Sequence, residues 1–256
     1  MRTLRFAILR PRKHCIERFV SAVDSGASCC SIEDSDVITK LQNHDTIVFG
    51  FPVYYSNIPK IAKDFITENK SVFNGKKVYI ITTKGLHNAF GIGYARRMFN
   101  DCGAEFIGSS QFNMPDNIRD IKIMEAVFDY SKDGKIIEKA DRKIIKAAER
   151  FKANKPQKNG LNPYSYIAGF FFKILWFYPK TNNYITAPKV NIEKCNGCRK
   201  CVKLCPMQNI SIVDNKAVSG GKCTVCYRCM NNCSKKALTI LGNKVCGQYD
   251  FEKVLK

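Results

Sequence analysis

The chain has 256 residues, and 45% of them are hydrophobic, including 17 Phe and 11 Tyr. This apolar content argues against a chain that is disordered throughout, and the length suits two domains of unequal size. Lys and Arg outnumber Asp and Glu by 42 to 22, which gives a net charge of +20. Such a charge attracts acidic proteins, anionic membranes and nucleic acid alike, and a basic solvated surface explains it equally well.

The N-terminal residues Met1 to Phe6 lack the apolar stretch and small-residue cleavage site of an export signal. The most apolar segment, residues 167–178, is 12 residues long and contains Lys173. A membrane-spanning helix needs about 20 apolar residues. We therefore expect a cytoplasmic protein without a transmembrane segment. Its 13 cysteines stay reduced there, and clustered reduced cysteines more often bind metal.

Residues 1 to about 153 alternate between strand and helix patterns. We predict strands at 4–9, 27–32, 46–51, 77–82 and 104–112, and helices at 15–23, 58–67, 91–102 and 136–151. Five β-α units predict an α/β fold with a doubly wound parallel five-stranded sheet, covered by helices on both faces. Ligands of such sheets bind beyond the carboxyl ends of the strands, so the loops after the first, third and fourth strands are the candidate site.

Two of these loops resemble the flavin-binding loops of flavodoxin. One is Phe49 to Ser56, and the other is Thr82 to Leu86 followed by Gly91-Ile92-Gly93. A flavin ring needs a stacking side chain and backbone donors along its polar edge. The resemblance therefore implies an FMN site made by Pro52, Val53, Tyr54, Tyr55, Thr83, Lys84 and Gly85. The alternative is that the two tyrosines only pack over the rim of the sheet.

The first loop differs from the flavodoxin pattern. Flavodoxins place hydroxyl residues and a glycine after the first strand, where they wrap the FMN phosphate at a helix N-terminus. This chain has Ile8-Leu9-Arg10-Pro11-Arg12 instead, and Pro11 has no N–H to donate. Arg10, Arg12 and Lys13 could hold a phosphate by charge. The sequence thus leaves open whether FMN is bound.

Residues 154–188 are predicted to link two domains. Residues 154–160 have the composition of a linker, and the segment 161–178 is rich in aromatic residues and is followed by Pro179. This aromatic segment is apolar nearly all round, which favours a helix buried between the domains. An amphipathic anchor on a membrane surface is the alternative.

Two runs of cysteines follow, and each run has the spacing C-x-x-C-x-x-C-x-x-x-C. Their members are Cys195, Cys198, Cys201 and Cys205 in the first run and Cys223, Cys226, Cys229 and Cys233 in the second. Each cysteine of the second run lies 28 positions after its counterpart. The repeat indicates an internal duplication.

This spacing predicts two [4Fe-4S] clusters. Three closely spaced thiolates meet three irons of one cluster, and the fourth cysteine of the opposite run supplies the remaining ligand. Cys195, Cys198, Cys201 and Cys233 are therefore expected to bind cluster 1, and Cys223, Cys226, Cys229 and Cys205 to bind cluster 2. A pair of zinc sites is the alternative, but zinc usually takes two separated pairs of ligands.

The run pattern resembles the bacterial-type two-cluster ferredoxins over residues 189–242, with residues 243–256 left as a C-terminal tail. The whole chain resembles the EFR1-type proteins, in which a flavodoxin-like domain is fused to such a ferredoxin. The resemblance implies an iron-sulfur flavoprotein that transfers electrons in the cytoplasm of an anaerobe, an oxidoreductase-type carrier without a defined substrate. Its expected partner is a redox protein with an acidic surface, and nucleic acid is not expected. The alternative function is a redox-sensing or interaction module with clusters and an empty flavodoxin-like scaffold.

Overall fold

The computed structural model describes residues 5–8, 13–27, 29–54, 57–85, 91–123, 129–161 and 188–254. The chain folds as two compact units. The first contains Met1–Met114 and Ile136–Ile174, and the second contains Pro115–Lys135 and Leu175–Lys256. The predicted aromatic segment, apart from Leu161, lies outside the described residues.

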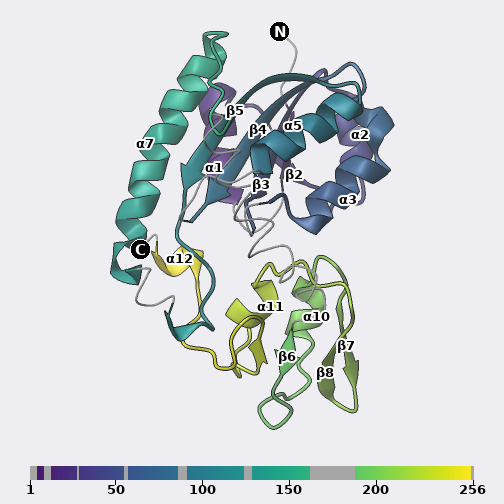
Figure 1. Ribbon diagram of the computed structural model, residues 1–256, viewed down its shortest axis with the longest axis vertical. Coiled ribbons are helices and arrows are strands. Elements are labelled where there is room, and N and C mark those ends of the chain that lie inside the picture. Colours follow the sequence, from purple (N-terminus) through teal and green to yellow (C-terminus); the bar gives the residue numbers. More distant parts are fainter. Residues whose placement is uncertain are drawn as a thin grey trace. The chain divides into compact units, whose positions relative to one another are not determined.

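The first unit is built on a parallel sheet of five strands (Figure 1). The strands are β1 (Arg5–Ile8), β2 (Cys29–Ser31), β3 (Thr46–Pro52), β4 (Lys77–Lys84) and β5 (Glu105–Asn113). Their order is β2-β1-β3-β4-β5, so the chain reverses its direction of progress across the sheet between β1 and β3. In such sheets a ligand binds at the carboxyl ends of the strands beside this switch point.

The apolar run of β3 has side chains that alternate between the two faces of the sheet. Phe49 belongs to the core on one face, together with residues of α2 (Val37–Gln42), α3 (Lys60–Glu68), α4 (Lys70–Phe73) and α5 (Gly91–Asp101). Its ring is fully buried and contacts Phe99 with a centroid distance of 5.2 Å. The helices α2 and α4 are short, and the periodicity of the sequence did not predict them.

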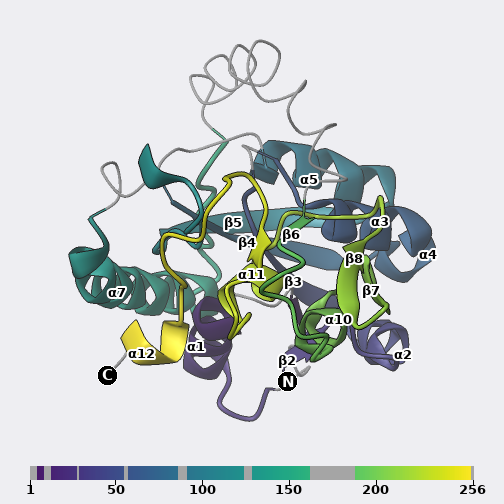
Figure 2. The same cartoon turned by 90° about the horizontal axis from the view of Figure 1, so that it is seen from below.

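Helices α1 (Lys13–Val23) and α7 (Asp133–Lys152) cover the other face of the sheet, opposite α3, α4 and α5 (Figure 2). Phe19 of α1 stacks on Tyr79 of β4 with a centroid distance of 5.4 Å. Gly50 lets α1 approach the sheet, because a Cβ atom there would lie 1.9 Å from Cδ1 of Ile16.

Tyr79 supplies a pH-dependent contribution to the stability of this unit. Its hydroxyl lies 2.5 Å from Oγ of Ser110, and burial raises its pKa to about 12. An unfolded tyrosine titrates near 10, so the unfolded chain loses its proton first as the pH rises. This contribution to stability is therefore fully present below about pH 10, and it declines by about 3 kcal/mol as the pH rises to about 12. Denaturant unfolding of wild type and Tyr79→Phe should differ in this decline; parallel curves would contradict the prediction.

The second unit contains two small antiparallel sheets. β6 (Lys189–Val190) pairs with β9 (Leu238–Thr239), and β7 (Ile210–Val213) pairs with β8 (Lys216–Ser219). The turn of the β7–β8 hairpin is Asp214-Asn215, and both residues have positive φ, as a two-residue hairpin turn requires. Its helical elements are the 3₁₀ helix η1 (Tyr130–Lys132), α10 (Lys200–Leu204), α11 (Arg228–Asn231) and α12 (Phe251–Val254).

This division places residues 115–135 with the second unit and divides the predicted linker 154–188 after Ile174. Residues 115–135 were assigned to the domain 1–153, whereas the described residues among them belong to the second unit. The physical reason is that their polar groups bond to residues 226–247. Among the described residues, no helix combines the length and apolar character needed to cross a membrane.

Candidate functional site

The two cysteine runs have the same local backbone. A positive φ recurs at three pairs of positions that lie 28 residues apart. Five of these six residues are not glycine, and a positive φ is uncommon for such residues. The pairs are Gly197 (67°) with Val225 (58°), Arg199 (62°) with Tyr227 (62°), and Gln208 (49°) with Lys236 (49°). The duplication read from the sequence therefore extends to the conformation of the loops between the cysteines.

Backbone N–H groups point at the sulfurs of both runs. Asn209 donates to Sγ of Cys205 at 3.2 Å, and Ala237 donates to Sγ of Cys233 at 3.3 Å. These two bonds are again 28 positions apart. Hydrogen bonds of this kind orient a ligand and stabilise the thiolate form that binds iron.

Four cysteines surround a cavity in the second unit. They are Cys205, Cys223, Cys226 and Cys229, and the rest of the wall includes Pro206, Ile210, Tyr227 and Ile240. Cys205 of the first run thus lies with three members of the second run. Within the described ranges, no three His, Cys, Asp or Glu side chains converge on the position of one metal ion. A cluster of four irons is larger than one ion, so its ligands must surround a volume.

Burial controls the protonation of these thiols. It raises the pKa of Cys223 to about 12, and it also raises the pKa of Cys229 and of Cys201. The neighbouring cysteines raise these values further. The free thiols are therefore protonated at neutral pH, and binding of iron must release protons.

The first run is more accessible to solvent. Cys198 is exposed, whereas Cys229 of the second run is buried. Cys201 lies in α10 and Cys229 in α11, and these two helices pack against each other. Gly197 fits tightly beside the β7–β8 turn, since a Cβ atom there would lie 2.4 Å from the carbonyl oxygen of Asn215.

The loops predicted to bind flavin leave neighbouring strands of the first unit. Pro52 pairs with Thr83 in the β3–β4 register, and the Val53 amide donates to the carbonyl of Thr83 at 2.8 Å. Tyr54 forms a bridge to Asn57, and Gly85 follows the end of β4. These residues therefore lie at one edge of the sheet. Tyr55 lies outside the described residues, as does the loop Leu9 to Arg12.

Lys84 places a cation at this edge of the sheet. Burial lowers its pKa, and the positive charge of Lys143 lowers it further. A bound anionic group would reverse this effect by favouring the charged form of the lysine.

Buried polar atoms without partners lie at the same end of the sheet. Oγ1 of Thr83 and of Thr82, and Nε2 of Gln111, are buried and have no hydrogen-bond partner. Thr82 pairs with both Phe51 and Gln111 across the sheet. Buried polar atoms are normally bonded, so an orphaned hydroxyl beside a ligand-binding edge fits a polar ligand such as the edge of a flavin ring. The described residues of this site are thus compatible with FMN.

The sequence did not predict that the segment 115–121 contacts the second cysteine run. The Asn117 side chain donates to the carbonyl of Cys226, and the Asp120 carboxylate accepts from the hydroxyl of Tyr227. Tyr227 lies between two predicted ligands. No spacing or motif marks this segment, because its partners lie more than 100 positions away.

Comparisons with known protein families find two different domains in this chain. A family model described as flavodoxin-like fold matches residues 22–132, and a model of the 4Fe-4S binding domain matches residues 187–210. No curated protein matches the chain.

Solved structures with similarity to this chain include flavodoxins. That of two-electron reduced flavodoxin from Megasphaera elsdenii is 18% identical, covers 43% of this chain and 85% of its own, and has a TM-score of 0.39. That of Fusobacterium nucleatum flavodoxin with flavin mononucleotide is 13% identical, covers 42% and 70%, and has a TM-score of 0.35. Trp repressor binding protein from Bacillus subtilis is 18% identical, covers 58% and 96%, and has a TM-score of 0.43. From the two family matches, this chain is a flavodoxin-like domain joined to a 4Fe-4S binding domain, the arrangement of a flavodoxin–ferredoxin fusion.

Proposed function

We propose that this protein is an electron-transfer iron-sulfur flavoprotein. It passes electrons between two [4Fe-4S] clusters and either FMN or an external redox partner in the cytoplasm of an anaerobe. The observation that carries the proposal is the cavity lined by Cys205 together with Cys223, Cys226 and Cys229. Cluster 2 is assigned to these four cysteines, and cluster 1 to Cys195, Cys198, Cys201 and Cys233.

The described cysteines have the features that a redox cluster needs. The predicted ligands other than Cys198 are buried or partly buried, which limits the access of water to a metal, and amide donors to sulfur tune its potential. The exposed Cys198 makes the first cluster the natural point of exchange with an outside partner. The chain is strongly basic, so we expect this partner to present an acidic surface.

FMN is assigned to the edge formed by Pro52, Val53, Tyr54, Tyr55, Thr83, Lys84 and Gly85. A bound flavin accepts one or two electrons, whereas each cluster exchanges one. The protein would contribute the Thr83 hydroxyl and backbone amides at the polar edge of the ring, with Lys84 as a nearby cation. An aromatic ring at Tyr54 or Tyr55 would provide stacking area.

A second function is favoured by one feature of the first loop. Arg10-Pro11-Arg12 offers neither a hydroxyl nor a glycine to a phosphate. In this alternative the flavodoxin-like domain is an empty scaffold, and the protein is a redox-sensing or interaction module that uses only its clusters.

Anaerobic purification tests the proposal. We expect about eight irons and eight acid-labile sulfides per chain, with flavin bands beside the broad cluster absorption. Cluster absorption without flavin would favour the sensing module. Zinc with no iron or sulfide would refute both functions.

Thr83→Val separates flavin binding from stability. Removing a buried hydroxyl that has no partner should leave the flavin-free protein as stable or up to about 1 kcal/mol more stable. The same change should weaken FMN binding about fivefold, since the loss of one hydrogen bond to a ligand costs about 1 kcal/mol. Titration with FMN and denaturant unfolding measure the two effects. Thr82→Val is the matched control, because it removes the neighbouring unpaired hydroxyl from the opposite side of the strand; equal effects of both variants on FMN would contradict the site.

A further inference from the structure

The second cysteine run is held by a carboxylate from a distant part of the chain. Asp120 is 2% exposed, and its carboxylate accepts four hydrogen bonds. Oδ1 accepts from the hydroxyl of Tyr227 at 2.9 Å. Oδ2 accepts from the backbone N–H groups of Ile240, Leu241 and Gly242 at 2.6, 3.0 and 3.1 Å.

Two of these partners belong to the wall of the cluster 2 cavity. Tyr227 and Ile240 line it beside the four cysteines, and the Tyr227 side chain is 1% exposed. The Asp120 carboxylate therefore bonds to two parts of the cavity wall. One is the loop between Cys226 and Cys229, and the other is the residue that follows β9. Removing the carboxylate would take the side-chain acceptor away from the amides of residues 240–242, which is costly where they are shielded from water.

The same segment also contacts a predicted ligand directly. The Asn117 side chain donates to the carbonyl of Cys226 at 3.2 Å, and the Asn231 side chain donates to the carbonyl of Asn117 at 3.0 Å. Gly242 is required at the crossing point, because a Cβ atom there would lie 1.5 Å from the carbonyl oxygen of Asp120. Position 242 therefore has no room for a side chain beside Asp120.

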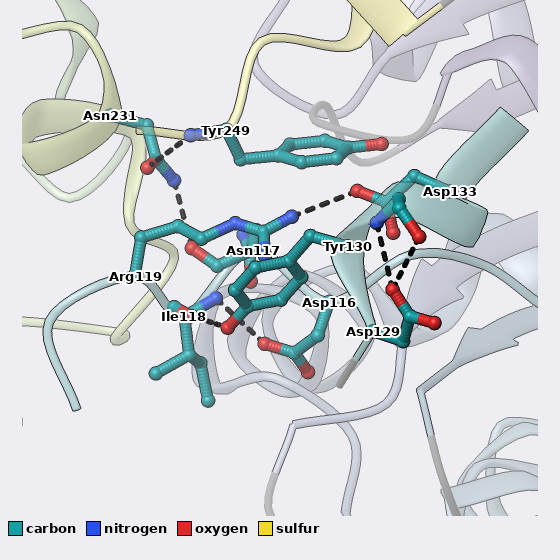
Figure 3. A network of polar contacts seen from close by, with 10 residues as sticks. Asp116, Asn117, Ile118, Arg119, Asp129, Tyr130, Asp133, Asn231 and Tyr249 are labelled. Carbon is teal, nitrogen blue, oxygen red and sulfur yellow. Dashed lines mark hydrogen bonds and ion pairs between the residues drawn. The ribbon is translucent and has the colours of Figure 1, made fainter. Parts of the chain in front are cut away.

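Arg119 fixes the direction of the segment (Figure 3). Its guanidinium group lies between the rings of Tyr130 and Tyr249, at 3.1 and 5.4 Å from their centroids, and pairs with Asp133 at 2.9 Å. Its carbonyl accepts from the amide of Cys246 at 2.8 Å. Arg119 and Asp133 are both buried, so this anchor is shielded from solvent. Because Arg119 is held in place, the side chain of Asp120, the next residue, lies where it accepts hydrogen bonds from Tyr227 and Ile240.

We propose that Asp120 is the positioning residue for cluster 2, and that its buried charge lowers the reduction potential of that cluster. The inference rests on the proposed function, since it takes Cys205, Cys223, Cys226 and Cys229 as the ligands. Reduction adds one electron to a cluster, and a fixed negative charge beside the wall disfavours that addition. The carboxylate thus has two separable effects, one through its hydrogen bonds and one through its charge.

Three variants separate these effects. Asp120→Ala removes the hydrogen bonds and the charge. Gly242→Ala displaces the segment and leaves Asp120 intact. Asp120→Asn removes only the charge, because the amide oxygen can accept from the three N–H groups while its NH₂ group donates to the oxygen of Tyr227.

Gly221→Ala is the control for the glycine change, since a Cβ atom there meets nothing within 4 Å. Asp250→Asn is the control for the charge, since Asp250 is exposed and solvent screens it.

Iron content identifies the cluster that is lost. We expect Asp120→Ala and Gly242→Ala to lose about half of the iron, and Asp120→Asn and both controls to keep all of it. With Cys198→Ala, which removes cluster 1, Asp120→Ala should leave essentially no iron. With Cys226→Ala, which removes cluster 2, it should cause no further loss. Hydrogen exchange at the amides of residues 240–242 should accelerate in Asp120→Ala, which reports on the hydrogen bonds without reference to iron.

The potential tests the charge. Asp120→Asn should raise the reduction potential of one cluster in an anaerobic redox titration and leave the other unchanged, whereas Asp250→Asn should shift neither. A full iron content in both Asp120→Ala and Gly242→Ala would overturn the positioning role, as would equal loss of both clusters. An unshifted potential in Asp120→Asn would overturn the role of the charge. Wild-type protein without iron and sulfide would instead refute the proposed function itself.

Discussion

The double variant Cys205→Ala/Cys226→Ala is expected to contain as much iron as either single variant, about four irons per chain. The reason is that Cys205 and Cys226 line one cavity, so the second substitution removes a ligand from a cluster that is already lost. The double variant Cys205→Ala/Cys198→Ala should lose essentially all iron, because its two substitutions affect different clusters. Iron and sulfide analysis of anaerobic preparations measures both outcomes.

A ligation within each run gives the opposite pattern. Cys205→Ala would then be non-additive with Cys198→Ala and additive with Cys226→Ala. The mirror pair Cys233→Ala/Cys198→Ala serves as an internal control, since it should behave like Cys205→Ala/Cys226→Ala. Any result in which Cys205 couples to Cys198 would refute the crossed assignment.

The largest loss of stability is expected from Phe49→Ala. Phe49 is fully buried in the first unit. The centroid of its ring lies within 6.3 Å of the ring centroids of four other phenylalanines, Phe51, Phe65, Phe73 and Phe99. Truncation removes buried apolar area and leaves a cavity in an aromatic cluster, at a cost of about 3–5 kcal/mol. Denaturant unfolding, followed by a signal from the first unit, measures the loss.

Phe106→Ala is the matched control for this change. Phe106 lies on the edge strand β5 and is only partly buried, with the guanidinium of Arg96 over its ring. Its truncation should cost less than half as much, because solvent and neighbouring side chains can fill the space. Equal costs at the two positions would contradict the account of the core.

Much of the first unit could be predicted from the sequence because its signals are local. The runs of β3 and β4 are long and apolar, and α7 has clear helical periodicity, so each shows its structure within its own residues. The short helices α2 and α4 have too few turns for a periodic pattern. Residues 115–121 could not be assigned, because their fold depends on partners that no local pattern reveals.

The candidate sites show the same contrast. The regular spacing of the cysteines predicts eight ligands, and the duplication could be read directly from the 28-residue offset. Asp120 is one aspartate among many in the sequence, and only the three-dimensional structure brings it to Tyr227 and Ile240. The proposed FMN site was predicted in part. Thr83 was named from the sequence, but its buried and unpaired hydroxyl became apparent only from the structure.

The hydrogen bond between the Asp120 carboxylate and the Ile240 amide joins residues 120 positions apart, so its two partners are synthesised at different times. At a synthesis rate of about 5–20 residues per second, Asp120 is added to the growing chain roughly 6–24 s before Ile240. A C-terminal fragment that begins at residue 188 would lack this carboxylate, so we expect it to assemble cluster 2 less completely than the whole chain does.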